Sequence, residues 1–294
     1  MGTPVQKLDA PASVLGEGPL WSDREQCLYF VDIVSRRLQA YWPATRQHRA
    51  WDFETYVGSI AECESGGLIV ALGDRVVRFR PDLADKGVGA LEELFVLERD
   101  RPLNRLNDGK VDPWGRFWVG SMRVKEDARE GRLWCLSGDG KARAVRDGIG
   151  VSNSIAFDRA RGRMYFADSM TGTIERADLN AAGELGAWAP FAKAGKGAPD
   201  GSCTDADGYL WNAEWGGWRV CRYAPDGTLE RTIEIPASRP SCCTFGGAGH
   251  RTLFVTTAQY NMTAAERAQD PNAGSLFSVE LDDVSGLPAD RFAI

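Results

Sequence analysis

The chain has 294 residues and a hydrophobic fraction of 43%, and its net charge of −6 gives an isoelectric point near 5.2. This acidic composition, without any basic run, argues against nucleic acid or an anionic membrane as a partner. No apolar stretch approaches the roughly 20 residues of a transmembrane helix, and the first residues lack the charged-then-apolar pattern of a secretory signal. The seven cysteines include no CxxC pair, so we expect reduced thiols in a cytoplasmic protein.

One strand-like sequence pattern recurs six times along the chain. Its copies begin 40, 49, 47, 46 and 43 residues apart. In chain order they are LYFVDI (28–33), LIVAL (68–72), FWVGSM (117–122), MYFADS (164–169), LWNAEW (210–215) and LFVTTA (253–258). Repeats of about 40–50 residues that hold several short strands are typical of β-propellers, in which each blade buries its faces against the next.

Each copy of the pattern has the companion strands that a blade requires. A short strand of small residues precedes every copy, an alternating strand follows it, and a more polar strand usually comes next. The preceding strands are GEGPLW (16–21), VGSIAEC (57–63), LNDGKVD (106–112), SNSIAFD (152–158), PDGSCTD (199–205) and SCCTFGG (241–247). We therefore predict an all-β fold, a six-bladed β-propeller with four-stranded blades around a central channel, formed by one domain over residues 1–294.

The sixth repeat differs from the others in two ways. Its outer edge has only the irregular tail RFAI (291–294), so we expect a strand near residues 4–9 to close this blade and cover its edge. Residues 260–273 interrupt the strands of the repeat. Thr263 and Glu266 form a capping-box pattern, which predicts a short helix there. This helix would either overhang the channel or lie on a surface loop without a role.

Four oxygen-bearing residues stand ten or eleven positions before four of the repeated runs: Glu17, Asn107, Asn153 and Asp200. Asn107 and Asp200, taken singly, also fit plain turns. Their common register is the stronger signal, because equivalent positions in a radial repeat point toward one axis. We therefore expect these four side chains to meet.

Two carboxylates and two carboxamides are hard oxygen donors suited to Ca²⁺, Mg²⁺ or Mn²⁺, and Zn²⁺ also accepts carboxylates. The only two histidines, His48 and His250, lie away from the predicted inner strands. A His-rich zinc site and a Ser-His-Asp triad are therefore not expected. One divalent metal ion with open coordination positions would suit catalysis.

Several of these segments closely resemble the SMP-30/gluconolactonase/regucalcin-like family, and the resemblance spans essentially the whole chain. It is carried by GEGPLW (16–21), NRLNDGKVDPWGRFWVGSM (104–122), VSNSIAF (151–157), PDGSCTDADGYLW (199–211) and CCTFGG (242–247). Members of the family are six-bladed propellers, mostly lactonases that use a divalent metal. The resemblance implies that Glu17, Asn153 and Asp200 are metal ligands and that Asp200 is also the general base. Arg105 and Asn107 would contact the substrate.

The segment after the third run departs from the animal proteins that this chain resembles, which carry acidic residues there. Arg123 and Lys125 stand in this segment. Together with Arg105 they would place cations at the channel mouth and favour a lactone with a remote sulfonate or phosphate. The alternative is a solvated hairpin loop.

Trp215, Tyr260 and Asn261 lie just after strand ends and would line a sugar pocket, or they would serve only in packing. The leading functional hypothesis is the hydrolysis of an aldono-1,4- or 1,5-lactone to the aldonic acid, with a small sugar lactone as the partner. The alternatives are an organophosphate-type hydrolase and a non-enzymatic calcium-binding or interaction propeller.

Overall fold

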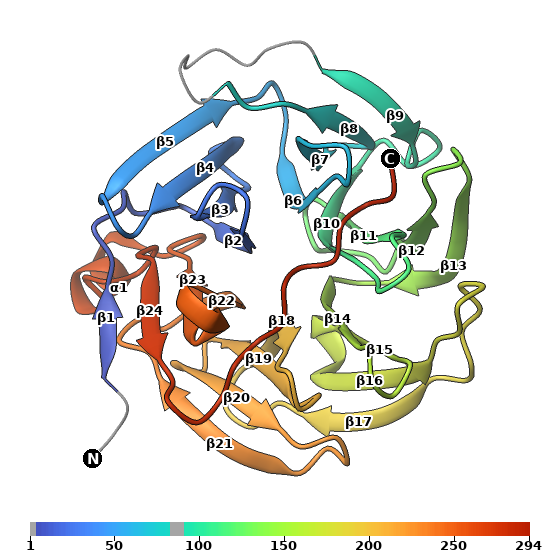
Figure 1. Cartoon of the computed structure of the whole chain (residues 1–294). Helices are drawn as coiled ribbons and strands as arrows, with labels where there is room; N and C mark the ends of the chain where they lie inside the picture. The colour runs from blue at the N-terminus through green and yellow to red at the C-terminus, as the bar shows by residue number, and fades with distance from the viewer. Residues whose placement is uncertain (1–3, 83–90) are drawn as a thin grey trace.

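Six four-stranded antiparallel sheets form a ring in the computed structural model, which describes residues 4–82 and 91–294 (Figure 1). The prediction of a six-bladed β-propeller is thereby confirmed. Within the described part of the chain, no helix is long and apolar enough to cross a membrane.

The first three blades each use four consecutive strands. Blade 1 contains β2 (Gly16–Ser22), β3 (Cys27–Asp32), β4 (Arg37–Trp42) and β5 (Gln47–Asp52). Blade 2 contains β6 (Val57–Glu62), β7 (Leu68–Leu72), β8 (Arg75–Phe79) and β9 (Glu92–Val96). Blade 3 contains β10 (Asn104–Val111), β11 (Phe117–Arg123), β12 (Gly131–Leu136) and β13 (Ala142–Ile149).

Blades 4 and 5 follow the same plan, and blade 6 combines both ends of the chain. Blade 4 contains β14 (Ser152–Asp158), β15 (Arg163–Asp168), β16 (Thr173–Asp178) and β17 (Ala189–Lys193), with a 3-10 turn, η1 (Ser169–Thr171), after β15. Blade 5 contains β18 (Ala198–Thr204), β19 (Leu210–Trp215), β20 (Arg219–Tyr223) and β21 (Leu229–Glu234). Blade 6 contains β22 (Pro240–Gly246), β23 (Thr252–Thr257), β24 (Phe277–Glu280) and the N-terminal β1 (Val5–Lys7).

Two short helical elements lie next to the strands of blade 6. The 3-10 turn η2 (Ala248–His250) precedes β23. The helix α1 (Ala264–Gln269) lies between β23 and β24, and Thr263 and Glu266 form the capping box at its N-terminus. The predicted helix in this segment is confirmed.

Apolar side chains fill the spaces between neighbouring blades. Trp51 of blade 1 packs edge-on against Phe79 of blade 2, with ring centroids 6.0 Å apart. Trp211 of blade 5 meets Phe245 of blade 6 in the same manner at 5.5 Å. Because each blade buries its faces against both neighbours, closing the ring completes the core.

Every innermost strand carries a β-bulge at an equivalent point. The pairing register with the second strand shifts between Glu17 and Leu20, Val57 and Ile60, Leu106 and Gly109, Asn153 and Ala156, Pro199 and Ser202, and Pro240 and Cys242. A bulge twists its strand locally and re-aims the side chains beside it. These bulges therefore turn side chains from successive blades toward the channel.

The C-terminal strap, residues 281–294, crosses one end of the channel (Figure 1). Its Phe292 is fully buried, and the Phe292 amide donates to the Glu62 carbonyl in blade 2 over 2.8 Å. Arg291 pairs with the Glu62 carboxylate at 2.8 Å. The tail RFAI therefore closes the channel against blade 2 and does not form the outer edge of blade 6, whose edge strand is β1.

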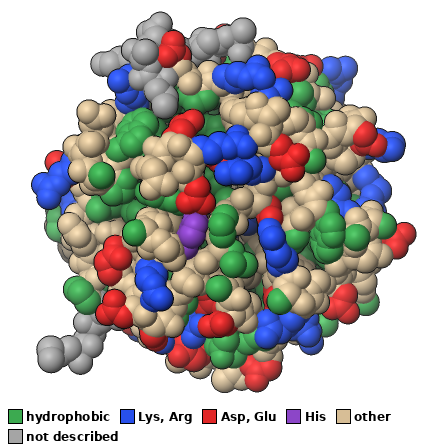
Figure 2. Space-filling view, viewed as in Figure 1, with side chains coloured by type: hydrophobic (Ala, Val, Ile, Leu, Met, Phe, Trp, Pro, Cys, Tyr) green, Lys and Arg blue, Asp and Glu red, His purple; other side chains and the backbone are tan. Residues whose placement is uncertain are grey.

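The face crossed by the strap carries Lys and Arg side chains interspersed with Asp and Glu side chains (Figure 2). On this face the positive side chains do not gather into one stripe.

Candidate active site

A pocket of about 370 Å³ opens at the end of the channel away from the strap. Residues early in the inner strands line it, such as Arg105 and Asn107 of β10. Later residues of the same strand, such as Lys110 and Val111, line a separate cavity beneath the strap. The two hollows therefore occupy opposite ends of the channel.

The four oxygen-bearing residues of the repeat all line this pocket: Glu17, Asn107, Asn153 and Asp200. Each is at most 8% exposed. Glu17 and Asn153 are the last paired residues before their bulges, whereas Asn107 and Asp200 are the first unpaired residues within theirs. The four occupy two adjacent positions of the repeat, which explains why their sequence spacing alternates between eleven and ten.

Hydrogen bonds fix the two carboxamides relative to each other. The Asn107 Nδ2 group donates to the Asn153 Oδ1 atom at 3.1 Å and to the Ser152 carbonyl at 2.9 Å. The Asn153 Nδ2 group donates to the Ser169 hydroxyl at 2.8 Å, and that hydroxyl donates to the Pro199 carbonyl at 2.7 Å. Ser169 thus holds the amide of Asn153 with its oxygen on the Asn107 side.

Burial and mutual repulsion raise the pKa values of the two buried carboxyl groups in the pocket. Burial, and then the charge of Asp108, raise the pKa of Glu17 to about 8. Burial, and then the charges of Glu17, Asp108 and Glu126, raise the pKa of Asp200 well above its ordinary value. Like charges at such sites destabilise each other. A bound cation would relieve this repulsion.

The Arg105 guanidinium forms part of the same network. Its Nη1 group donates to the Asn107 Oδ1 atom at 2.5 Å and to the Leu106 carbonyl at 3.1 Å. It also lies over the Tyr56 ring, 5.9 Å from the centroid. Burial lowers the pKa of Arg105, and the charge of Glu126 partly offsets this effect.

Other predicted pocket residues divide into two groups. Trp215, Tyr260 and Asn261 line the pocket. Arg123 and Lys125 are not among the residues that line it. The Arg123 guanidinium instead pairs with Asp127 at 2.5 Å and Glu130 at 2.9 Å, and the Lys125 side chain is exposed. The expected cluster of cations from this hairpin is therefore absent from the described pocket.

Sequence reasoning missed three polar residues that line the pocket: Glu126, Ser169 and Arg239. Ser169 directly follows β15, so the rule that selected Trp215 from a strand end would also have selected it. Glu126 adopts a left-handed backbone with φ of 56° at a hairpin turn. Arg239 lies in the connection between β21 and β22, where the sequence carries no repeated signal.

The donor set of the pocket fits a divalent metal ion. Glu17, Asn153 and Asp200 supply two carboxylates and one amide oxygen, the hard donors that Ca²⁺ and Mg²⁺ prefer. Among residues 4–82 and 91–294, no cluster of three or more His, Cys, Asp or Glu side chains is arranged to hold a metal. A metal site in the pocket would therefore need an oxygen ligand of another kind beside its carboxylates, such as the amide of Asn153 or Asn107.

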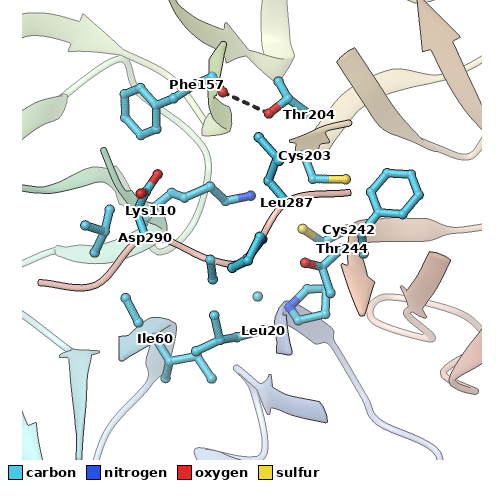
Figure 3. A pocket seen from close by; sticks show the side chains of 18 of the residues that line it. Leu20, Ile60, Lys110, Phe157, Cys203, Thr204, Cys242, Thr244, Leu287 and Asp290 are labelled. Carbon is cyan, nitrogen blue, oxygen red and sulfur yellow. Dashed lines mark hydrogen bonds between the residues drawn. The ribbon is translucent and has the colours of Figure 1, made fainter. Parts of the chain in front are cut away.

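The cavity beneath the strap differs from the open pocket in its size and in the residues that line it (Figure 3). It measures about 100 Å³ and is lined by Lys110, Cys203, Cys242 and residues 287–290 of the strap, among others. The Lys110 ammonium donates to the Ser202 carbonyl. None of Glu17, Asn153 and Asp200 lines this cavity, so the open pocket is the candidate active site.

The fold and the pocket together define a class of protein, a six-bladed β-propeller with a polar small-molecule pocket at one end of its channel. The chain belongs to the SMP-30/gluconolactonase/LRE-like family, because the sequence model of this family matches residues 15–259. The resemblance predicted from sequence is confirmed.

Known proteins similar to this chain include two bacterial lactonases. A putative sugar lactone lactonase of Bacillus subtilis is 34% identical, with 92% of each chain covered. A 6-deoxy-6-sulfogluconolactonase of Pseudomonas putida is also 34% identical, with 96% of each chain covered. A solved structure described as a calcium-binding protein, regucalcin, from Agrobacterium tumefaciens superposes with a TM-score of 0.93 at 28% identity, covering 100% of this chain and 99% of that one.

Proposed function

We propose that the protein hydrolyses a sugar lactone, an aldono-1,4- or 1,5-lactone, to its aldonic acid with the help of one divalent metal ion. The observation that carries this proposal is the convergence of the buried side chains of Glu17, Asn153 and Asp200 in one open pocket. Relatives named as sugar lactonases, which match nearly the whole chain, support the same class of reaction.

The residues of the pocket divide the chemistry between them. Asp200 accepts a proton at its carboxylate from the water that attacks the lactone carbonyl carbon. The C–O bond of the ring then breaks, and the ring oxygen takes up that proton as it becomes a hydroxyl group. Arg105 and Asn107 bind and orient the sugar from β10.

Glu17, Asn153 and Asp200 would hold the divalent ion. When bound, such an ion supplies a Lewis acid that polarises the carbonyl and stabilises the negative charge of the transition state. Ser169 contributes by fixing the orientation of the Asn153 amide. The apolar side chains of Leu15, Ile33 and Met122 in the pocket wall restrict the access of other water molecules.

Replacing the general base tests the assignment. We expect Asp200→Asn to keep the fold and to lose about 10²–10⁴-fold in turnover, because a positioned general base contributes a factor of that size. Lactone hydrolysis is followed with a pH indicator, and folding by circular dichroism. Asp207→Asn is the matched control, since this carboxylate of blade 5 lies on the surface at 73% exposure. Wild-type turnover in Asp200→Asn would contradict the assignment.

A panel of lactones, measured with a series of divalent metals and with chelated enzyme as the control, separates the alternatives. Hydrolysis of paraoxon or a fluorophosphate far above that of any lactone would favour an organophosphate-type hydrolase. Metal binding without hydrolysis of any lactone would favour a calcium-binding propeller.

A further inference from the structure

Two arginine side chains line the pocket without a carboxylate partner. Arg105 is 7% exposed, and Arg239 is half-buried. Among the described residues, neither guanidinium lies within 4.0 Å of a carboxylate oxygen. Arg123, on the hairpin that carries the lining residue Glu126, does not line the pocket and is paired with Asp127 and Glu130.

Other groups hold Arg239 in place. Its guanidinium lies over the Trp215 ring, 5.4 Å from the centroid, and its Nη1 group donates to the Tyr260 carbonyl. Both Trp215 and Tyr260 line the pocket. Cation–π contact and a backbone acceptor fix the position of the side chain without neutralising its charge. Hydrogen bonds to Thr263, and to a lesser extent the charge of Arg239, lower the pKa of the exposed Glu266. The Glu266 carboxylate is engaged in capping helix α1.

The location of Arg239 indicates which part of a substrate it would meet. Glu17, Asn153 and Asp200 are 5–8% exposed and lie at the bulges of inner strands, whereas Arg239 is half-buried in the connection before β22. Arg239 is therefore closer to solvent than the groups assigned to the reacting carbonyl. A substrate with its lactone carbonyl at the carboxylates would direct its far end toward the mouth of the pocket.

We propose that Arg239 is a specificity-determining residue that recognises an anionic group on the end of the lactone remote from the reacting carbonyl. This inference rests on the proposed lactonase function. The ligand class is a sugar lactone with a terminal sulfonate, phosphate or carboxylate, because the planar guanidinium binds two oxygens of such groups at once. Arg105 of β10, which is hydrogen-bonded to Asn107, adds a second positive charge to the pocket.

Three lactones that differ only at the terminal carbon provide the test. Glucono-1,5-lactone is neutral, and its 6-phospho and 6-deoxy-6-sulfo derivatives are anionic. We expect the wild-type protein to prefer an anionic lactone, and Arg239→Gln to lower kcat/KM for it by about 10–100-fold, mainly through KM, since a charge-assisted hydrogen bond contributes that much. The neutral lactone should lose about threefold at most. Arg239→Lys keeps the positive charge but cannot bind two oxygens at once. Its kcat/KM for the anionic lactone should therefore lie between the values of the wild-type protein and Arg239→Gln. The size of the loss for each derivative identifies which anion is recognised.

Lys125→Gln is the matched control, because it removes one positive charge from an exposed side chain outside the lining. It should leave the ratio of anionic to neutral kcat/KM unchanged. An equal loss on both lactones in Arg239→Gln, or the same change of ratio in Lys125→Gln, would overturn the inference.

Product binding separates this inference from the function on which it rests. Calorimetry should show 6-phosphogluconate binding more tightly than gluconate to the wild-type protein, and Arg239→Gln should remove the difference. Equal binding of the two acids to the wild-type protein would overturn the role of Arg239. Absence of hydrolysis of every lactone would instead overturn the proposed function, whatever the binding data show.

Discussion

Glu214, near the end of β19, is a fully buried carboxylate whose main partners are one arginine and two backbone amides. Arg219 donates from its Nε atom at 2.8 Å and from Nη2 at 3.1 Å. The backbone amides of Gly195 and Lys196 donate at 3.0 and 3.1 Å. Burial by itself would raise the pKa of Glu214, but these hydrogen bonds outweigh burial and lower the pKa to about 2.

Replacing this carboxylate should destabilise the fold. We expect Glu214→Gln to cost about 3 kcal/mol of unfolding free energy, because it leaves Arg219 buried without its partner. The pKa is lower in the folded state, so the carboxylate stabilises the fold above its ordinary value of 4.5, and this contribution is lost as the pH falls toward 2. Urea unfolding at several pH values measures both effects. Glu234→Gln, at 63% exposure in the same blade, is the control and should change little. Equal stability of the two variants would contradict this account.

Strand β1 is the outer edge strand of blade 6. Its three residues pair with β24 in antiparallel register, from Val5 opposite Val279 to Lys7 opposite Phe277. The next residue, Leu8, is 8% exposed, and its amide donates to the Leu276 carbonyl at 2.8 Å. Without β1, the edge of β24 would present unpaired backbone groups, which invite association with other chains.

Deletion of residues 1–7 should therefore lower the melting temperature by on the order of 5 °C and promote self-association. Differential scanning fluorimetry and light scattering measure the two effects. Deletion of residues 1–3 alone leaves β1 in place and serves as the comparison. If the two truncated proteins have the same melting temperature and the same light scattering, β1 does not protect the edge of blade 6.

The C-terminal strap acts at the scale of the whole molecule, because it joins blades that are distant in the sequence. Besides Phe292, its Asp290 pairs with Arg159 of blade 4, and the Ala206 amide in blade 5 donates to Ser285 over 2.9 Å. The strap also covers the cavity that Cys203 and Cys242 line. It therefore both links the ring and closes one end of the channel.

Removing the side chain that anchors the strap tests this role. Phe292→Ala should cost about 3–5 kcal/mol, the usual loss for a buried phenylalanine. Local opening of the strap should also make Cys203 and Cys242 react faster with a thiol reagent. Asp282→Ala is the control, since that side chain of the strap is exposed and does not line the cavity. Unchanged thiol reactivity in Phe292→Ala would show that the strap does not guard the channel.

The sequence indicated much of the candidate site because the repeat places equivalent residues on one axis. Glu17 and Asp200 could be selected from spacing, although spacing alone did not show that they occupy different positions of the bulge. Arg123 was expected at the pocket, but Asp127, four residues later, offered a nearer partner. Arg239 could not be found, because its place depends on how Trp215 and Tyr260 from two blades pack around it.

By itself, the sequence determined the six blades, their strand pattern and the convergence of Glu17, Asn107, Asn153 and Asp200, because these depend on local periodicity repeated around an axis. Only the tertiary structure decided which charges face the pocket and where the C-terminal strap lies. The positions of Arg239 and of the strap depend on contacts between segments far apart in the chain, and such contacts leave no periodic trace in the sequence.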